Sequence, residues 1–272
     1  MGENLTGVTG PRDEDLLSRL VVEARQDLQR RRALIAQELF ERAVASYTPR
    51  DFKAALAARG LAVIAEMKQR TPSMGVLVED YRPADLAHAY ADGGATAISV
   101  LTHMAGFGGR PEHIQSARAA TTLPILRKDF VTDPYEVGEA RAAGADAVLL
   151  IVAALDREHL AELLAVARSR GIAALVEVHD EAETRLALEA GAQIIGVNHR
   201  DLRTFAVDLG LTERLRKLIP PNVVVVAESG IRTPEDARRM YEAGADAILV
   251  GELLMRSADP AKQIRELTEW SA

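Results

Sequence analysis

The sequence predicts an α/β protein, a (β/α)8 or TIM barrel preceded by an N-terminal helical extension. From residue 61 onward, short apolar runs rich in β-branched residues alternate with longer patterns rich in Ala, Arg and Glu. Such alternation is typical of parallel βα units. The apolar runs lack polar alternation, as expected for strands that are covered on both faces. Eight such units favour a closed barrel over an open sheet.

The predicted strands are the eight apolar runs, and all of them are short enough to be strands rather than buried helices. They are Leu61–Met67, Ala97–Leu101, Pro124–Lys128, Ala147–Val152, Ala173–Val178, Ile194–Val197, Val223–Glu228 and Ala247–Val250.

A repeated phrase supports the same count of units. It has the pattern of a helix that ends on Gly, turns, and enters a buried strand. It occurs at Ala91–Ile98, Ala142–Val148, Glu189–Ile195 and Glu242–Ile248.

The helices between the strands are marked by Asp or Thr before Pro or Glu, which are N-cap signals. The segments include Pro134–Ala143, Arg157–Ser169, Glu181–Glu189 and Pro234–Ala243. Residues 14–46 have apolar side chains at three- and four-residue intervals and no internal Gly or Pro, so we expect one or two further helices there. We therefore assign residues 1–60 to the extension and 61–272 to the barrel, as one domain overall.

Composition excludes several classes of function. The chain has 272 residues, a formal net charge of -7 and no basic tract, so we expect no nucleic-acid partner. It has no Cys, which excludes disulfides, thiolate catalysis and Cys-based metal sites. The polar N-terminus resembles neither a signal peptide nor a spanning helix. We expect a cytoplasmic protein without a membrane partner, either a monomer or a weak homo-oligomer.

Polar residues gather at the carboxyl ends of the predicted strands, where this fold places its active sites. One such residue alone is a solvated strand end or a structural ion pair. So many together must pair or bind something. Carboxylates near lysines favour proton transfer, because each partner and the local desolvation shift the other's pKa. The residues are Glu66, Lys68, Lys128, Asp129, Glu177, Asn198, Arg200, Glu228 and Ser229.

Three further features concern a ligand. Ser229-Gly230 and Gly251-Glu252 follow the seventh and eighth strands, where loops of this fold often grip phosphate with backbone N–H groups. Phe107 lies in the Gly-rich loop after the second strand, where it either covers a flat ligand or packs on a neighbouring loop. The six His residues lack paired ligand spacing, so we expect no metal site and structural or surface roles for them.

Several specific motifs occur in order along the chain: "AEMKQRTPSMG" at 65–75, "LRKDFVTDPYEV" at 126–137, "LVEVHDE" at 175–181, "VNHRDLRTF" at 197–205, "AESGI" at 227–231 and "VGELLMR" at 250–256. With these motifs the chain resembles the indole-3-glycerol phosphate synthase family of tryptophan biosynthesis. The resemblance runs from about Leu61 to Arg256 and is weaker in the N-terminal helices, which in the family cover the barrel mouth.

The resemblance implies the cyclisation, decarboxylation and dehydration of 1-(2-carboxyphenylamino)-1-deoxyribulose 5-phosphate, without a cofactor. It implies that Lys128 is the general acid, that Glu177 is the general base of the later steps, and that Lys68 with Glu66 assists binding and ring closure. The remaining matches are substrate-binding positions: Ser73 near the substrate carboxylate, Phe107 on the anthranilate ring, Asn198, Arg200 and Glu228 around the reacting centre, and Ser229, Gly230, Gly251 and Glu252 at the phosphate.

The sequence departs from the family pattern mainly in the loop from His103 to Arg110, where an acidic residue and a Gly-Gly-Ser are usual. Thr71 replaces a commoner Ser, and His199 replaces a second Asn. These changes spare the matched lysines and Glu177, so we expect the chemistry to be retained and substrate affinity to differ. The alternatives are a sister phosphate-binding barrel and a non-catalytic barrel that binds a phosphorylated ligand through a diverged second-strand loop.

Overall fold

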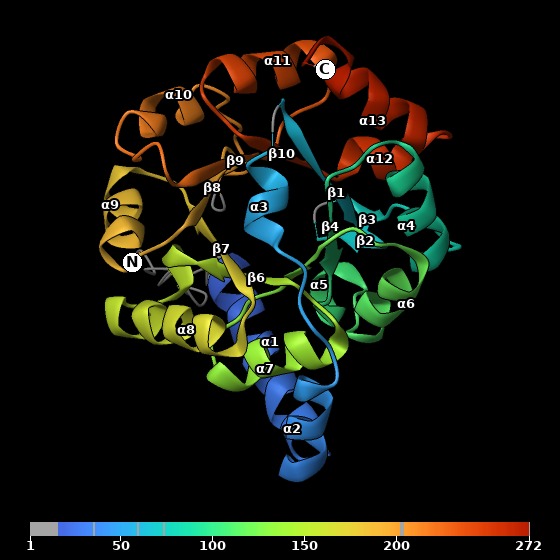
Figure 1. Ribbon diagram of the computed structural model, residues 1–272, viewed down its shortest axis with the longest axis vertical. Coiled ribbons are helices and arrows are strands. Elements are labelled where there is room, and N and C mark those ends of the chain that lie inside the picture. Colours follow the sequence, from blue (N-terminus) through green and yellow to red (C-terminus); the bar gives the residue numbers. More distant parts are fainter. Residues whose placement is uncertain (1–15, 35, 59, 73, 202–203, 272) are drawn as a thin grey trace, which may run out of the picture.

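The computed structural model describes residues 16–34, 36–58, 60–72, 74–201 and 204–271, and it confirms the predicted barrel. Eight parallel strands close in the order β1-β10-β9-β8-β7-β6-β5-β4, and β1 pairs with β4 to complete the ring. Figure 1 shows them inside a ring of helices. The strands are β1 (Ala62–Met67), β4 (Ala97–Leu101), β5 (Ile125–Lys128), β6 (Ala147–Ile151), β7 (Ala173–Val178), β8 (Ile194–Asn198), β9 (Val224–Glu228) and β10 (Ala247–Val250). A small antiparallel pair, β2 (Arg70–Thr71) and β3 (Gly75–Val76), follows β1.

The outer layer alternates with the strands as predicted, and most helices begin at a capping side chain. In α7, for example, the Asp133 carboxylate accepts a hydrogen bond from the backbone N–H of Tyr135 at 2.8 Å. The helices are α4 (Pro83–Asp92), α5 (Met104–Phe107), α6 (Glu112–Ala120), α7 (Pro134–Ala143), α8 (Arg157–Arg170), α9 (Glu181–Glu189), α10 (Leu211–Arg216), α11 (Pro234–Glu242), α12 (Glu252–Arg256) and α13 (Pro260–Thr268), with 3-10 turns η1 (Val152–Ala154) and η2 (Glu269–Ser271). Within the described ranges, none of the helices combines the length and apolar character needed to cross a bilayer.

The repeated phrase forms one kind of turn. Its glycine has a positive φ at each of its four occurrences, from 84° at Gly94 to 97° at Gly144. Glycine adopts this left-handed conformation without a steric penalty, and it ends the preceding helix there. The repeat in the sequence is therefore a repeat of one helix-to-strand connection.

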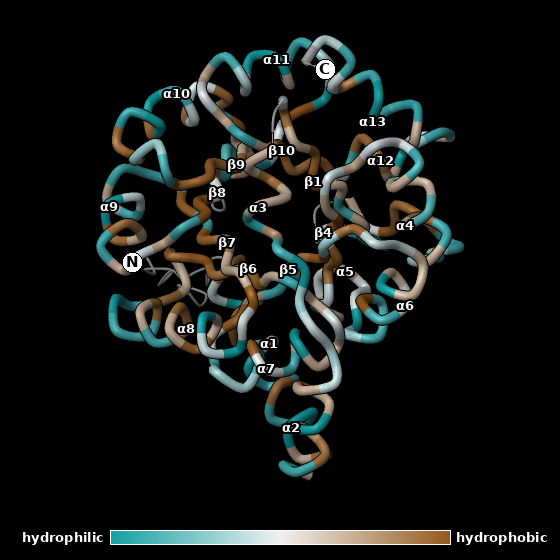
Figure 2. The backbone as a smooth tube through the Cα atoms, in the orientation of Figure 1, coloured by the Kyte–Doolittle hydropathy of each residue, from teal (hydrophilic) through white to brown (hydrophobic). Residues whose placement is uncertain are grey.

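Alternation along the strands divides the core into two layers. Val63, Ala65 and Met67 of β1 belong to the larger cluster, between the strands and the outer helices, whereas Ala62 and Ile64 belong to a cluster inside the barrel. Figure 2 shows the strands as mostly hydrophobic and the outer helices as mixed. The next inward positions are polar: Glu66 lies on β1, and Lys68 follows directly after that strand.

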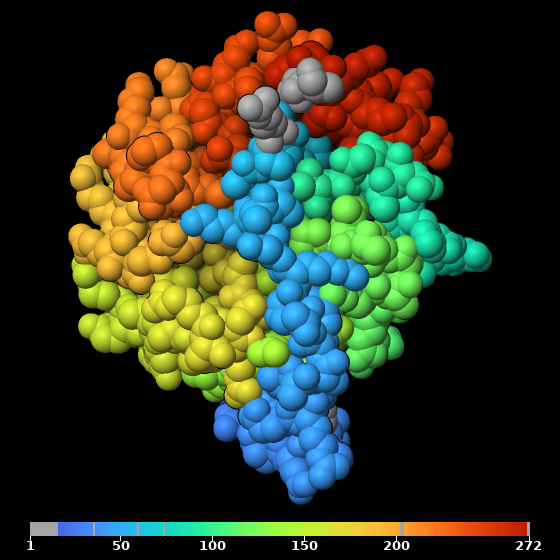
Figure 3. All heavy atoms as spheres, viewed as in Figure 1, coloured from blue at the N-terminus to red at the C-terminus, as the bar shows by residue number. Residues whose placement is uncertain are grey.

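The N-terminal segment forms three helices, α1 (Leu16–Arg32), α2 (Gln37–Ala45) and α3 (Phe52–Leu56). Phe52 and Leu56 of α3 are buried against the residues that begin the strands, so α3 covers the amino-terminal end of the barrel. Figure 3 shows this blue segment running across the barrel centre. Phe40 of α2 stacks on Tyr135 of α7, with ring centroids 4.3 Å apart. The opposite, carboxyl end is left open for a site.

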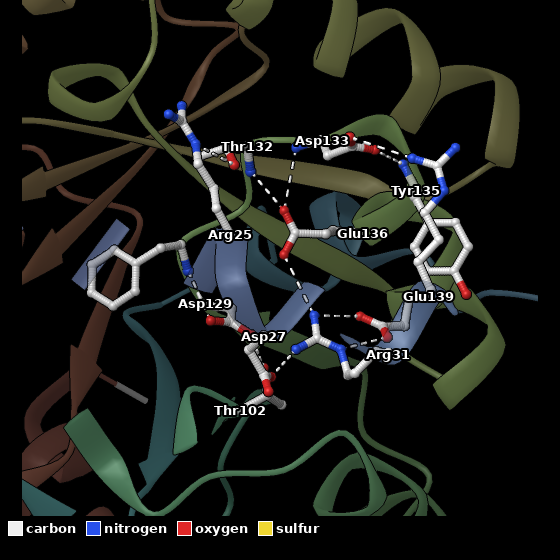
Figure 4. Close-up of polar contacts among 12 residues, drawn as sticks. Arg25, Asp27, Arg31, Thr102, Asp129, Thr132, Asp133, Tyr135, Glu136 and Glu139 are labelled. Carbon is white, nitrogen blue, oxygen red and sulfur yellow. Dashed lines mark hydrogen bonds and ion pairs between the residues drawn. The ribbon is translucent and has the colours of Figure 1, made fainter. Parts of the chain in front are cut away.

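A network of ion pairs connects α1 to the end of β5. Arg31 of α1 donates to the two carboxylate oxygens of Glu139 at 2.7 and 3.1 Å, as Figure 4 shows. Glu139 also accepts from Arg127 at 2.7 Å, and Arg127 contacts Asp129 at 3.0 Å. Arg127 is fully buried, and burial opposes its charge, but the carboxylates of Glu139 and Asp129 outweigh that effect and raise its pKa. The network therefore links α1 to α7 and, through Arg127, to the end of β5.

We expect Arg31→Met to lower the free energy of unfolding by about 2 kcal/mol, because a charged hydrogen-bonding group is lost and Glu139 keeps fewer donors. Arg30→Met is the matched control, since Arg30 is 74% exposed and pairs with Asp27 at 3.2 Å. It should change stability by about 0.5 kcal/mol or less. Urea unfolding of both variants measures the difference, and equal losses would contradict the role of the network.

Candidate active site

A cavity of about 650 Å³ opens at the carboxyl ends of the strands. All the predicted site residues that the structure describes line it, and Ser73 lies outside the described residues. Leu16, Leu17 and Leu20 of α1 form part of its wall. The cavity thus brings together Glu66, Lys68, Phe107, Lys128, Glu177, Asn198, Arg200, Glu228, Ser229, Gly230, Gly251 and Glu252.

Lys128 is the centre of the polar layer. Its ammonium donates to Glu177 Oε2 at 3.0 Å and to Glu228 Oε2 at 3.1 Å. Burial disfavours the ammonium, but the two carboxylates outweigh burial and raise the pKa of Lys128. The side chain therefore carries a proton at neutral pH, in a position where it can donate it to a bound group.

The two carboxylates around Lys128 differ in their surroundings. Burial opposes the charge of Glu177, but Lys128 and His179 outweigh it and lower its pKa. Burial and the negative charge of Glu177 raise the pKa of Glu228 to about 7, against the effect of Lys128. Asn198 donates to Glu177 Oε1 at 3.0 Å. Glu177 is therefore the ionised partner, and Glu228 is the one that takes up a proton.

Glu66 and Lys68 are two residues apart at the end of β1, so alternation directs both towards the barrel interior. Lys68 Nζ lies 2.5 Å from Glu66 Oε1. Gly251 makes room for this pair, because a Cβ atom at position 251 would lie 2.5 Å from Glu66 Oε1 and 2.9 Å from Lys68 Nζ. Gly251 was predicted to lie at a phosphate, and its close approach to Glu66 and Lys68 is a second, packing reason for a glycine at this position.

Gly196 makes room for Glu228 in the same way. It lies on the inward face of β8, and a Cβ atom there would overlap Glu228 Oε1 and lie 3.2 Å from Glu228 Cδ. Asn198 pairs in register with Glu228 on the neighbouring β9, so the two polar side chains enter the cavity from adjacent strands.

We expect Gly196→Ala to displace the Glu228 carboxyl group and to destabilise the protein by about 1–3 kcal/mol, as overpacking does. Glu228→Ala removes the group that the new methyl would meet. In a double-mutant cycle, Gly196→Ala should therefore cost much less stability in the Glu228→Ala background. Additive losses in chemical unfolding would show that the methyl group meets something else.

The loops after β9 and β10 lie side by side at the cavity. Ser229 has a φ of 67°, which is unusual for a residue with a side chain, and Gly230 has a φ of 82°. His199 supports this turn, since its Nδ1 donates to the Ser229 carbonyl at 2.9 Å and its Nε2 accepts from Thr212 at 2.7 Å. His199, which stands where the family usually has Asn, is therefore hydrogen-bonded at both ring nitrogens.

The loop after β4, the second strand of the barrel, is partly helical, because its residues include α5. His103 caps that helix by accepting a hydrogen bond from the Gly106 N–H at 3.1 Å, and its ring meets Phe130 edge-on at 5.2 Å. Phe107 ends α5 and borders the cavity. The divergent residue His103 thus stabilises the segment that presents Phe107.

Asp129 borders the cavity, as expected, but its carboxylate is already paired there. It accepts from Thr102 at 2.5 Å and pairs with Arg127, which lies on the same face of β5, whereas Lys128 lies on the other face.

Sequence reasoning missed the leucines of α1 and the cations Arg232 and Arg256, which line the cavity, and it missed His179, which contacts Glu177. His179 continues the alternation of Glu177, which was the available signal. Among the residues that the structure describes, no three His, Asp or Glu side chains are grouped to hold a metal ion.

Comparison with known proteins agrees with this geometry. The family model for indole-3-glycerol phosphate synthase matches residues 17–267. The chain is 59% identical to indole-3-glycerol phosphate synthase 2 of Streptomyces coelicolor, over 93% of this chain and 98% of that protein. It is 50% identical to the indole-3-glycerol phosphate synthase of a Roseiflexus species, with the same coverage.

Among solved structures, 3-hexulose-6-phosphate synthase from Salmonella typhimurium superimposes with a TM-score of 0.62 and 19% identity, over 77% of this chain and 97% of that one. At that identity the likeness concerns the fold alone. The polar layer at the open end of the barrel and the match along nearly the whole chain lead to one assignment: the chain belongs to the indole-3-glycerol phosphate synthase family.

Proposed function

We propose that this protein is an indole-3-glycerol phosphate synthase, a carboxy-lyase of tryptophan biosynthesis. Its substrate would be 1-(2-carboxyphenylamino)-1-deoxyribulose 5-phosphate. The observation that carries the proposal is the Lys128 ammonium held between Glu177 and Glu228 at 3.0 and 3.1 Å, inside a cavity of about 650 Å³. Family membership supports the same reaction.

Lys128 acts as the general acid in this proposal. Attack of the aromatic ring on the ribulose carbonyl places negative charge on the carbonyl oxygen, and a nearby ammonium stabilises that charge and can protonate it. The substrate nitrogen supplies electrons to the ring carbon, and carbon dioxide leaves once aromaticity has been interrupted. The reaction needs no cofactor, because the substrate's own nitrogen is the electron source.

Glu177 acts as the base of the later steps, when a proton is removed and water leaves. Its lowered pKa keeps it ionised at neutral pH, and Asn198 and Lys128 hold one oxygen each. Lys68 and Glu66 assist binding and ring closure, and Arg200 and Glu228 border the reacting centre.

The phosphate would lie at the loops Ser229-Gly230 and Gly251-Glu252, and Phe107 would contact the anthranilate ring. The backbone N–H groups of these loops would bind the phosphate. The Glu252 carboxylate, which would otherwise repel it, is paired with Arg256 at 3.3 Å. Arg232 borders the same cavity and adds positive charge near the proposed phosphate, and Arg256 offsets the negative charge of Glu252. Ser73, which the family resemblance assigns to the substrate carboxylate, lies outside the described residues, and its role stays a prediction.

The experiment is a steady-state assay of purified protein with the carboxyphenylamino-deoxyribulose phosphate, followed by indole fluorescence. Continuous product formation supports the enzyme. Saturable binding without product would instead favour the non-catalytic phosphate-binding barrel. A cytoplasmic location and a monomer or weak homo-oligomer remain proposals from composition, and light scattering of the purified chain would test the latter.

A further inference from the structure

His179 lies beside the proposed base and is held from behind. The ring Nδ1 is 3.1 Å from Glu183 Oε2, and the ring Nε2 is 3.4 Å from Glu177 Oε1. The same Glu183 oxygen accepts the backbone N–H of His179 at 2.7 Å. Glu183 is itself fixed in the first turn of α9, where its N–H donates to the Asp180 carboxylate at 2.8 Å. The side chain of His179 is 15% exposed, so the ring has little freedom to turn away.

The charges around this ring favour the imidazolium. The largest electrostatic contributions to this ring come from Glu177 of β7 and Glu183 of α9. Burial opposes the positive charge, but the two carboxylates outweigh it and raise the pKa of His179 to about 10. Nε2 makes no conventional hydrogen bond within the described residues, and it forms an ion pair with Glu177 Oε1.

The contact between His179 and Glu177 makes the surroundings of Glu177 differ from those of Glu228. Lys128 lies almost midway between Glu177 and Glu228, so it does not by itself decide which carboxylate is ionised. His179 and Asn198 both contact Glu177, whereas Glu228 Oε1 has no partner among the described residues. An opposite charge within about 4–6 Å lowers a carboxyl pKa by about 1–3 units.

We propose that His179, oriented by Glu183, is a positioning residue that as an imidazolium confines the negative charge of the Glu177 and Glu228 pair to Glu177 and fixes that carboxylate towards the cavity. The proposal deepens the proposed function and rests on it only where turnover is measured. The ring itself does not need to touch the substrate.

The first test reads the charge of His179 without any assay of turnover. In protein labelled with ¹⁵N-histidine, the signal that disappears in His179→Gln belongs to His179. We expect that signal to stay that of an imidazolium from about pH 5.5 to about pH 8.5, where an ordinary histidine titrates. Titration near pH 6.5 in the folded wild type would overturn the proposal.

The second test compares pH profiles of kcat. Without the imidazolium, Glu177 holds its proton to higher pH, so the ratio of His179→Gln to wild-type kcat should fall by a factor of about 3 to 10 from about pH 8 to about pH 6. Glu183→Gln keeps an oxygen for both hydrogen bonds but removes its charge, so it should give a smaller fall of the same sign. A ratio that is constant with pH, in variants that fold normally, would overturn the proposal.

His159→Gln is the matched control. Its Nδ1 lies 2.8 Å from Asp156, yet the pair is exposed on α8 and the residue does not border the cavity. Its pH profile should follow that of the wild type. If the wild type itself makes no product, the proposed function fails, and the signal of His179 still decides this inference separately.

Discussion

Lys128→Met is expected to lower kcat by about 10²- to 10⁴-fold, the usual contribution of a positioned general acid. Met has a similar length and lacks both the proton and the charge that the developing oxygen anion needs. Lys53→Met is the matched control, because Lys53 contacts Gln193 at 3.0 Å from α3, at the other end of the barrel. The control should keep wild-type turnover, and a Lys128 variant that does the same would remove the proposed acid.

The same substitution should also alter stability in a pH-dependent way. Without Lys128, two buried carboxylates lose their shared cation, and we expect a loss of about 3 kcal/mol in unfolding free energy at about pH 7. Loss of the cation then raises the pKa of Glu177 and raises further that of Glu228, which already lies above its ordinary value in the wild type. Stability contributed by such groups is lost as pH rises through the folded pKa, so the deficit should shrink on acidification from about pH 8 to about pH 5. Urea unfolding across that range measures it, and a pH-independent deficit would contradict the charge argument.

Glu177→Gln is expected to bind substrate and to convert it slowly. The amide has the shape of the carboxylate but cannot take a proton, so kcat should fall by about 10²- to 10⁴-fold while KM stays within about threefold. Glu181→Gln is the matched control, since Glu181 is an exposed residue of α9 that pairs with Arg185 at 3.0 Å. Single-turnover and steady-state measurements separate binding from chemistry. Unchanged turnover in Glu177→Gln would exclude it as the base.

Much of the fold was predictable, because each βα unit carries local signals. Asp133 and Thr233 cap their helices as the sequence indicated. The predicted helix bounds Pro134–Ala143 and Glu181–Glu189 agree with α7 and α9. The short helix α3 was not predicted, because so short a helix is stable only through tertiary packing, here of Phe52 and Leu56 against the end of the barrel.

The positions of the site residues also followed from simple periodicity. Parallel strands of a barrel end on one face, and alternate residues face inward, which places Glu66, Lys128 and Glu177 in one cavity. Their chemical roles stay predictions, which the Lys128 and Glu177 variants test.

The sequence by itself determined the number of strands, their inward faces and the residues that could carry acid–base chemistry, because these depend on short-range patterns. Only the tertiary structure decided how the charges pair. It directed Asp129 to Arg127, gave Lys128 two carboxylates and placed His179 against Glu177. The physical reason is that an ion pair depends on distances of a few ångströms between strands and helices that are far apart in the chain, and on burial that strengthens each such contact.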